Sequence, residues 1–197
     1  MVWLSTTLAG MGSQMEVVVL GWFVLTLTDS PFLVGLVSGA RMGLNFLALF
    51  AGAIADRMSR QLLLTAVEFV MASLGLLMLS LILTGLLQVL HIFIITLVSG
   101  LVRMFQTPSA QSLVADTLPE DRISNGAALT NMGMNLSTIV GPLIGGVQEL
   151  GPEGAYAAIV LLYSLSGISA LLVRISRATS SRSRVNVQYG APGVEVR

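Results

Sequence analysis

The sequence alternates between long apolar stretches and short polar breaks. Reading the stretches against the breaks predicts six segments, at residues 2–27, 32–54, 62–84, 87–114, 123–147 and 155–173. About 20 apolar residues are enough for a helix to cross the hydrocarbon core of a bilayer. Backbone groups in lipid must bond within the protein, and the alternating strands of a membrane barrel are not seen in the sequence, so helices are expected. The pattern predicts an all-α membrane protein with six transmembrane helices.

The connections between the predicted helices are short, so successive helices are expected to be antiparallel neighbours. Residues 1–175 are predicted to form one bundle, arranged as two three-helix units in a 3+3 inverted repeat. Residues 176–197 contain mostly Ser, Arg, Gly and scattered Val, with no apolar run long enough to span. This stretch is predicted to be a cytoplasmic tail or a truncated central linker.

The composition agrees with a lipid environment and excludes several kinds of function. Of the 197 residues, 54% are hydrophobic and 10% are charged, whereas soluble domains carry about 25% charged residues. The sequence has no cysteine and a single histidine, His91, which excludes Cys-based and His-rich metal centres. With zero net charge and no dense basic patch outside the tail, no nucleic-acid partner is expected. A Gly-x-x-x-x-Gly-Lys loop is missing, which excludes an ATP-driven pump, and no cofactor is expected.

The arginines predict the orientation in the membrane. The ten cations are all arginines, and eight of them lie in the loops after the second and fourth helices or after the sixth. The loops on the opposite side hold acidic residues and no arginine. Because cytoplasmic loops carry an excess of positive charge, both termini are predicted to be cytoplasmic in a multi-pass cell (inner) membrane protein.

Four ionisable residues fall inside the predicted helices, namely Glu16, Arg41, Glu68 and Arg103. Each costs about 2.5–3.5 kcal/mol at mid-helix, so each needs apolar neighbours and a partner. Further polar residues repeat at helical spacing near them, as in a bundle that lines a wet cavity. The predicted substrate and proton pathway comprises Glu16, Arg41, Arg103, Gln106, Asn131 and Asn135. The alternative is structural, with Arg41 and Glu68 forming a packing pair that fixes helix register.

Small residues form a second pattern. The second helix carries Gly35, Gly39 and Gly43 on one face, and the fifth carries Gly141, Pro142 and Gly145. Small residues four apart let helix backbones approach closely, and proline permits a kink. Static packing is one interpretation, and rocking of two bundles against each other is the other.

The loop after the second helix resembles the signature loop of the major facilitator superfamily, G-x-x-x-D-R-x-G-R-[RK]. The matching residues are Gly52, Asp56, Arg57 and Arg60, while Ser59 and Gln61 depart from the pattern. Arg103 with Gln106 resembles the Arg motif of the fourth helix in this family. The Gly-Pro-x-x-Gly-Gly stretch at residues 141–146 is similar to the antiporter motif of the fifth helix. Arg41, with Pro-Glu-Asp-Arg at residues 119–122, resembles the macrolide-efflux and siderophore-exporter type.

The resemblance implies the N-terminal six-helix half of a transporter, because family members have twelve helices in two halves. It implies a proton-coupled exporter of small molecules such as drugs or siderophores, with alternating access, and with Asp56, Arg57 and Arg60 as a gating latch. The proton gradient would supply the energy. Expected partners are the lipid bilayer, a small-molecule substrate, and a C-terminal six-helix half or a second copy of the chain.

Two alternatives come from other functional classes. The chain is either a working half or an inactive fragment or partner subunit without transport of its own. An intramembrane serine protease also has a six-helix core, but it needs Gly-x-Ser-Gly and a His on another helix. Here Ser99 follows Leu-Val, and His91 lies on the same helix, so an enzyme is the least favoured interpretation.

Overall fold

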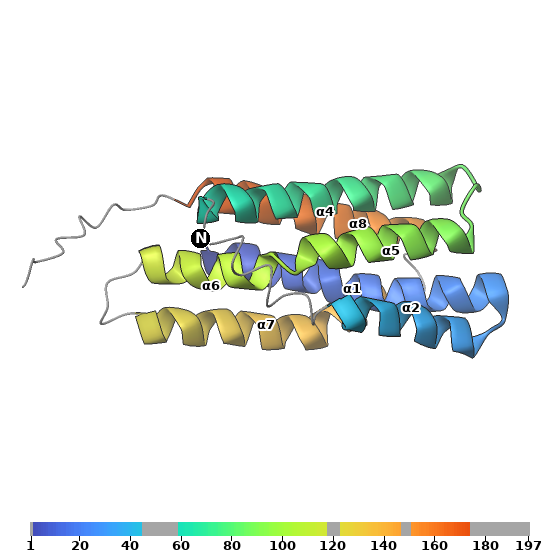
Figure 1. The fold of residues 1–197 in the computed structure, drawn as a ribbon, viewed down its shortest axis with the longest axis horizontal. Helices are drawn as coiled ribbons and strands as arrows, with labels where there is room; N and C mark the ends of the chain where they lie inside the picture. Colours follow the sequence, from blue (N-terminus) through green and yellow to red (C-terminus); the bar gives the residue numbers. More distant parts are fainter. Residues whose placement is uncertain (1, 45–58, 118–122, 147–150, 174–197) are drawn as a thin grey trace, which may run out of the picture.

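The computed structural model describes residues 2–44, 59–117, 123–146 and 151–173. The described regular structure is entirely helical, and the helices run along the long axis of the molecule (Figure 1). They are α1 (Val2–Thr28), α2 (Pro31–Gly43), α4 (Arg60–Leu83), α5 (Val89–Arg103), α6 (Gln106–Thr117), α7 (Ile123–Gly145) and α8 (Gly151–Leu171). The prediction of an all-α protein is confirmed for this part of the chain.

Four segments are long and apolar enough to cross a membrane, judged by length and composition. They are α1, α4, α8 and the combined stretch Val89–Val114. The described part of α2 has 13 residues, which is too short, and the rest of its predicted segment lies outside the described residues. Asparagines at positions 125, 131 and 135 lower the hydropathy of α7 below that of the four. The described residues therefore support four of the six predicted spans, and the 3+3 arrangement stays a prediction.

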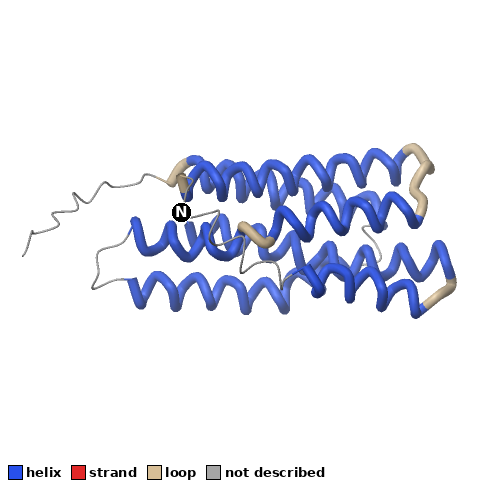
Figure 2. The backbone as a smooth tube through the Cα atoms, in the orientation of Figure 1, coloured by secondary structure: helices blue, strands red, loops and turns tan. Residues whose placement is uncertain are grey.

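The fourth predicted segment is not one continuous helix. α5 ends at Arg103 and α6 begins at Gln106, with a short turn between them that Figure 2 shows in the middle of the bundle. Pro108, near the start of α6, has no N–H to donate to a carbonyl of the preceding turn. The backbone instead tightens, with Phe105 N donating to Val102 O at 3.2 Å. The span predicted at 87–114 agrees with the candidate span Val89–Val114, and the proline near the start of α6 accounts for its division into two helices.

Local residue chemistry explains several helix ends. Pro31 occupies the first position of α2, where its missing N–H has no helical partner to lose, and Ser30 caps the helix. Gly85 follows α4 with a φ of 67°, which favours glycine. His91 Nδ1 accepts the backbone N–H of Gln88 at the start of α5, at 3.3 Å. The single histidine thus has a structural role.

α1 is the central helix of the bundle. It packs most extensively against α7 and α8, and it also contacts α2, α5 and α6, while α4 packs along α8. The main core buries Met15 of α1, Met71 of α4, and Tyr156 and Tyr163 of α8. A side chain at the middle of α1 is therefore surrounded by several other helices.

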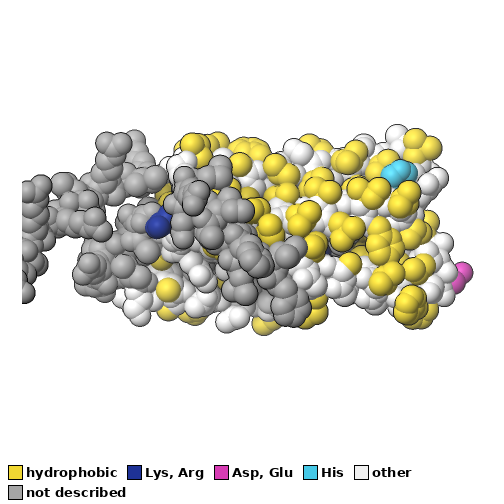
Figure 3. Space-filling view, in the orientation of Figure 1, with side chains coloured by type: hydrophobic (Ala, Val, Ile, Leu, Met, Phe, Trp, Pro, Cys, Tyr) yellow, Lys and Arg dark blue, Asp and Glu magenta, His cyan; other side chains and the backbone are white. Residues whose placement is uncertain are grey.

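The outer surface is largely apolar. Large hydrophobic side chains such as Leu62 and Leu83 of α4 and Leu161 of α8 are more than half exposed. On the face drawn in Figure 3 they cover much of the described surface, with charged side chains near the two ends. Exposure of so extensive an apolar surface to water is unfavourable, whereas such a surface suits contact with lipid in a bilayer.

The two sets of glycines behave differently. A Cβ on Gly141 would lie 2.6 Å from Gln14 Cβ and 2.9 Å from Met11 O, so α7 approaches α1 closely at this point. A Cβ on Gly145 would lie 3.1 Å from Met15 Cα and 3.2 Å from Met15 O, so the backbones are close there too. At Gly35, Gly39 and Gly43 no described atom lies within 4 Å of such a Cβ, and all three are exposed. The close packing predicted for the face of the second helix has no counterpart among the described residues.

Candidate functional site

Glu16, at the middle of α1, is the acceptor of a buried cluster of charges. The residue is 6% exposed, and its Oε2 accepts from Arg103 Nη2 at 2.9 Å. The Tyr163 hydroxyl of α8 donates to the same oxygen at 3.3 Å and accepts from Arg103 Nη2 at 2.7 Å. Arg41 Nη2 lies 3.8 Å from Glu16 Oε2. Three helices, α2, α5 and α8, thus bring two guanidinium groups and a phenol to one acidic side chain of α1.

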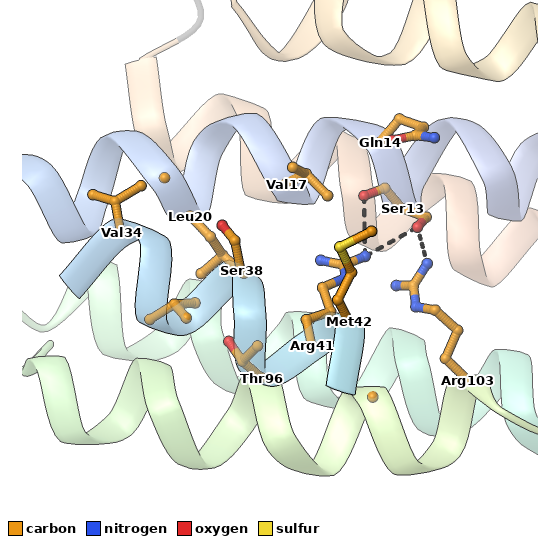
Figure 4. Close-up of a pocket in the computed structure, with 13 residues that line it drawn as sticks. Ser13, Gln14, Val17, Leu20, Val34, Ser38, Arg41, Met42, Thr96 and Arg103 are labelled. Atoms are coloured by element: carbon orange, nitrogen blue, oxygen red, sulfur yellow. Dashed lines mark hydrogen bonds between the residues drawn. The ribbon is translucent and has the colours of Figure 1, made fainter. Parts of the chain in front are cut away.

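Ser13 joins the two arginines. It lies one turn before Glu16 on the same side of α1, as residues three apart do. Its hydroxyl accepts from Arg41 Nη2 at 3.0 Å and also from Arg103 Nη1. Figure 4 shows the two guanidinium groups reaching Ser13 from α2 and α5. We call Ser13, Glu16, Arg41, Arg103 and Tyr163 the charged centre.

The charged centre has more positive than negative charge when its arginines and Glu16 are ionised and the phenol of Tyr163 is neutral. Two guanidinium groups face one carboxylate. In addition, Arg41 Nη1 and Arg103 Nε are buried without a hydrogen-bond partner among the described residues. Such N–H groups keep unused capacity to bind an anion or a water molecule.

Two cavities flank the charged centre. One has a volume of about 460 Å³, and Arg41, Ser38 and Thr96 line it together with apolar side chains of α1 and α2 (Figure 4). The other, of about 420 Å³, lies between α1, α6 and α7. Ser13, Gln14 and Arg103 line both. The arginine that holds Glu16 therefore lies between two spaces that a small molecule or water can occupy.

A family model for transmembrane secretion effectors matches residues 1–188. The chain belongs to this family. Membership of the transmembrane secretion effector family places it among the membrane transporters of the major facilitator superfamily and favours a transporter over an enzyme. No curated protein matches the chain.

The Arg41–Glu68 packing pair, which the sequence left open as an alternative, is not the pairing that the structure shows. Arg41 pairs with Glu16 instead, and Glu68 Oε1 accepts from Gln106 Nε2 at 2.7 Å. The two carboxylates have different partners because the fourth predicted segment is broken between α5 and α6. Arg103 at the end of α5 reaches Glu16, and Gln106 at the start of α6 reaches Glu68, so two residues three apart hold two different carboxylates.

Asn131 and Asn135 of this transporter lie on the exposed side of α7, away from the charged centre. The side that faces α1 carries Ser137, whose hydroxyl donates to Thr7 O at 2.9 Å. The helical repeat of the asparagines was visible in the sequence, but periodicity alone does not say which side of a helix turns inward.

Of the predicted gating loop, Gly52, Asp56 and Arg57 lie outside the described residues. Arg60, the first residue of α4, donates from Nη1 to Ser112 O of α6 at 3.3 Å. The neighbouring Gln61, which departs from the family pattern, donates from Nε2 to Val173 O at 2.8 Å and to Leu171 O at 3.0 Å. Gln61 thus satisfies free carbonyls at the end of α8, as a C-terminal cap does.

Tyr163 was not predicted as a site residue. A phenol in an otherwise apolar membrane helix is a usable sequence signal, because its hydroxyl needs a partner in lipid. Nothing in the sequence connects position 163 to position 16, which lies in another helix. Among the described residues, no three His, Cys, Asp or Glu side chains come together as a metal site requires.

Proposed function

We propose that this chain forms half of a proton-coupled exporter of small molecules that works by alternating access. The observation that supports this proposal is the buried carboxylate of Glu16, held by Arg103 and Tyr163 and flanked by Arg41 at the junction of two cavities. A carboxylate inside a membrane protein is costly, and proton relays are among the functions for which such residues are kept.

Protonation of Glu16 changes the interactions that hold the bundle together. The ionised carboxylate attracts Arg103 and Arg41, and a proton on Oε2 removes that attraction. The guanidinium groups are then free to bind an anionic group in the cavity or to move with α2 and α5. Because α1 contacts five other helices, this change reaches much of the bundle. The proton and the substrate thereby favour different arrangements of the same helices.

The cavity favours small amphipathic molecules. Its wall combines apolar side chains such as Val17 and Leu20 with two arginines that have unused N–H groups. Drugs and siderophores, the substrates of the exporter types that the sequence resembles, combine apolar and polar or anionic groups in this way. We propose Arg41 and Arg103 as the groups that orient the polar part of the substrate.

The second wall of the substrate path is proposed to come from another bundle, either a C-terminal six-helix half or a second copy of the chain. The exposed glycines of α2 and the exposed asparagines of α7 would face it. Asp56, Arg57 and Arg60 would act as a latch between conformations. In this proposal the protein lies in the inner membrane with both termini in the cytoplasm.

The test is transport of a fluorescent macrolide into inside-out vesicles that contain the chain together with the second bundle. We expect Glu16→Gln to abolish transport driven by an imposed proton gradient, because the amide cannot take up or release a proton. Exchange of labelled for unlabelled macrolide without a gradient should continue. Glu153→Gln is the matched control, since Glu153 is an exposed residue in the first turn of α8.

Full gradient-driven transport by Glu16→Gln would remove Glu16 from the mechanism. Transport by the wild type that does not respond to the proton gradient would overturn proton coupling itself. Omission of the second bundle separates the remaining possibilities. Activity of the chain alone as a dimer supports a second copy, and activity that returns only with the C-terminal half supports a split transporter.

A further inference from the structure

A second buried carboxylate lies outside the charged centre. Glu68 of α4 is completely buried, and its Oε1 accepts from Gln106 Nε2 at 2.7 Å. Its other oxygen, Oε2, is buried and has no hydrogen-bond partner among the described residues. The neutral amide of Gln106 and the nearby hydroxyl of Ser166 do not offset the desolvation of an ionised carboxylate. Oε2 therefore needs either a proton or a water molecule.

Two more buried hydroxyl groups share this position between α4 and α6. Thr65 Oγ1 and Ser109 Oγ are both buried without a partner in the described part of the chain. Thr65 lies three residues from Glu68, and Ser109 lies three residues from Gln106, so each shares a helix face with its neighbour. Unsatisfied polar groups are costly and are therefore uncommon in protein interiors.

Two contacts, one near each end, fix how the two helices align. Glu68 meets Gln106 at one end, and Arg60 Nη1 donates to Ser112 O at the other, so α4 and α6 run antiparallel. Thr65 and Ser109 lie between these two contacts on their respective helices. Glu68 and Thr65 on α4, like Gln106 and Ser109 on α6, are about 4.5 Å apart along the helix axis, a gap that a single bridging water can cover. Thr65 and Arg60 are about 7.5 Å apart along α4, a gap that two waters can cover.

We propose that Glu68, Thr65 and Ser109 form a water-filled seam through which Glu68 exchanges a proton with the membrane face at which Arg60 lies. In the exchange, Glu68 Oε2 forms an O–H bond with a proton from a hydronium ion in the seam, and that ion becomes water. Release is the reverse step. Oε1 accepts from Gln106 in both states, so the amide holds the side chain in place throughout.

The surroundings of Glu68 allow this exchange. Gln106 faces it from α6 and Ser166 faces it from α8, and neither carries a charge. Arg103 at the end of α5 is the charged group that acts on it among the described residues. Gly167 of α8 closes the other side, since a Cβ there would lie 3.4 Å from Glu68 Cβ. Because Arg103 also binds Glu16, a change in the charge of Glu68 alters the electrostatic interactions of the charged centre.

A role of the seam in coupling rests on the proposed proton-driven export. The presence of water in the seam and the proton exchange at Glu68 do not depend on that proposal. The first experiment therefore measures water access without transport. The chain has no cysteine, so single-cysteine variants report directly. Silver ion, a small hydrated cation that binds thiolates, is added to vesicles containing Thr65→Cys or Ser109→Cys. The remaining free thiol is then counted with a maleimide after denaturation.

We expect silver to protect both seam cysteines from the maleimide. Met71→Cys is the control, because Met71 is 2% exposed on the same helix but lies in the apolar core. It should stay unprotected. Seam cysteines that react like Met71→Cys would show a dry interface and overturn the proposal.

The second experiment measures the proton. Infrared difference spectra between acidic and alkaline buffer should contain a carboxylic acid band that Glu68→Gln removes and Glu16→Gln retains. Glu68→Asp keeps a carboxyl group and should retain a shifted band, which separates loss of the proton from misfolding. A Glu68→Gln spectrum that has lost no carboxylic acid band relative to the wild type would overturn the proposal. If the seam is wet and Glu68 titrates while transport ignores the proton gradient, the proposed function fails and the proton site stands.

Discussion

At the scale of single residues, the charged centre depends on hydrogen bonds that fix one carboxylate between two cations. Arg103 contributes most, because its guanidinium donates to Glu16, Tyr163 and Ser13. The planar fork of an arginine suits such divergent contacts better than the ammonium of a lysine. Tyr163 completes the arrangement, since its hydroxyl both accepts from Arg103 and donates to Glu16.

Replacement of Tyr163 by phenylalanine tests this arrangement. The ring stays in place, while a hydroxyl that bonds to two charged groups is lost. We expect the free energy of unfolding in detergent to fall by about 1.5–3 kcal/mol, the usual range for hydrogen bonds to charged groups. Denaturant titration followed by circular dichroism measures it. In the double variant with Glu16→Gln the additional loss should be smaller, and strictly additive losses would show that the two side chains do not interact.

At the scale of helices, α1 has two different neighbours. α7 packs closely against it through glycines, whereas the glycines of α2 are exposed and make no such contact. Gly141 and Gly145 let α7 lie directly against α1, whereas the glycines of α2 face no described atom. Glycine therefore has a different structural role in each of the two helices. On α7 it permits packing that exists within the bundle, and on α2 it leaves a smooth surface.

A pair of alanine substitutions tests these two roles of glycine. Gly141→Ala places a methyl group 2.9 Å from a backbone oxygen of α1, so the helices must shift. We expect a loss of about 1–3 kcal/mol in the free energy of unfolding. Gly39→Ala meets no described atom and should stabilise its helix by about 0.5–1 kcal/mol. The melting temperature of each variant in detergent is the measurement, and equal effects at both sites would contradict the packing seen here.

At the scale of the whole molecule, the bundle has faces of two kinds. The exposed residues of α4 and α8 include Leu76, Leu77, Leu161 and Leu165, which suit lipid. The exposed side of α7 carries Asn131 and Asn135, and polar groups facing lipid tails are unfavourable. This difference is the reason to expect the second bundle beside α7 and α2 and lipid beside α4 and α8.

Site-specific photocrosslinking tests this orientation. A benzophenone side chain at position 135 should form an adduct in membranes, with the mass of two chains or of the chain plus a C-terminal half. At position 161 of α8, where Leu161 is 62% exposed, it should label lipid and give no protein adduct. Adducts of equal yield at both positions would show that the second bundle does not prefer the α7 face.

The sequence by itself determined that the chain lies in a lipid bilayer and that it is helical, because both follow from the spacing and length of apolar runs. The four segments confirmed as candidate spans were all predicted within a few residues. It also singled out Glu16, Arg41 and Arg103 as candidate site residues, since charges inside apolar helices stand out in any sequence. Proline at position 108 was visible too, but the sequence pattern did not show that it divides the helix.

The tertiary structure decided which of these residues meet. Pairing of Glu16 with Arg103, and of Glu68 with Gln106, depends on how four helices rotate about their axes and on a turn at Met104 and Phe105. Helical periodicity repeats equally well for an inward and an outward face, so Asn131 and Asn135 looked no different from Ser137. Packing breaks that symmetry, because close contact with α1 is possible only on the side where α7 carries glycine.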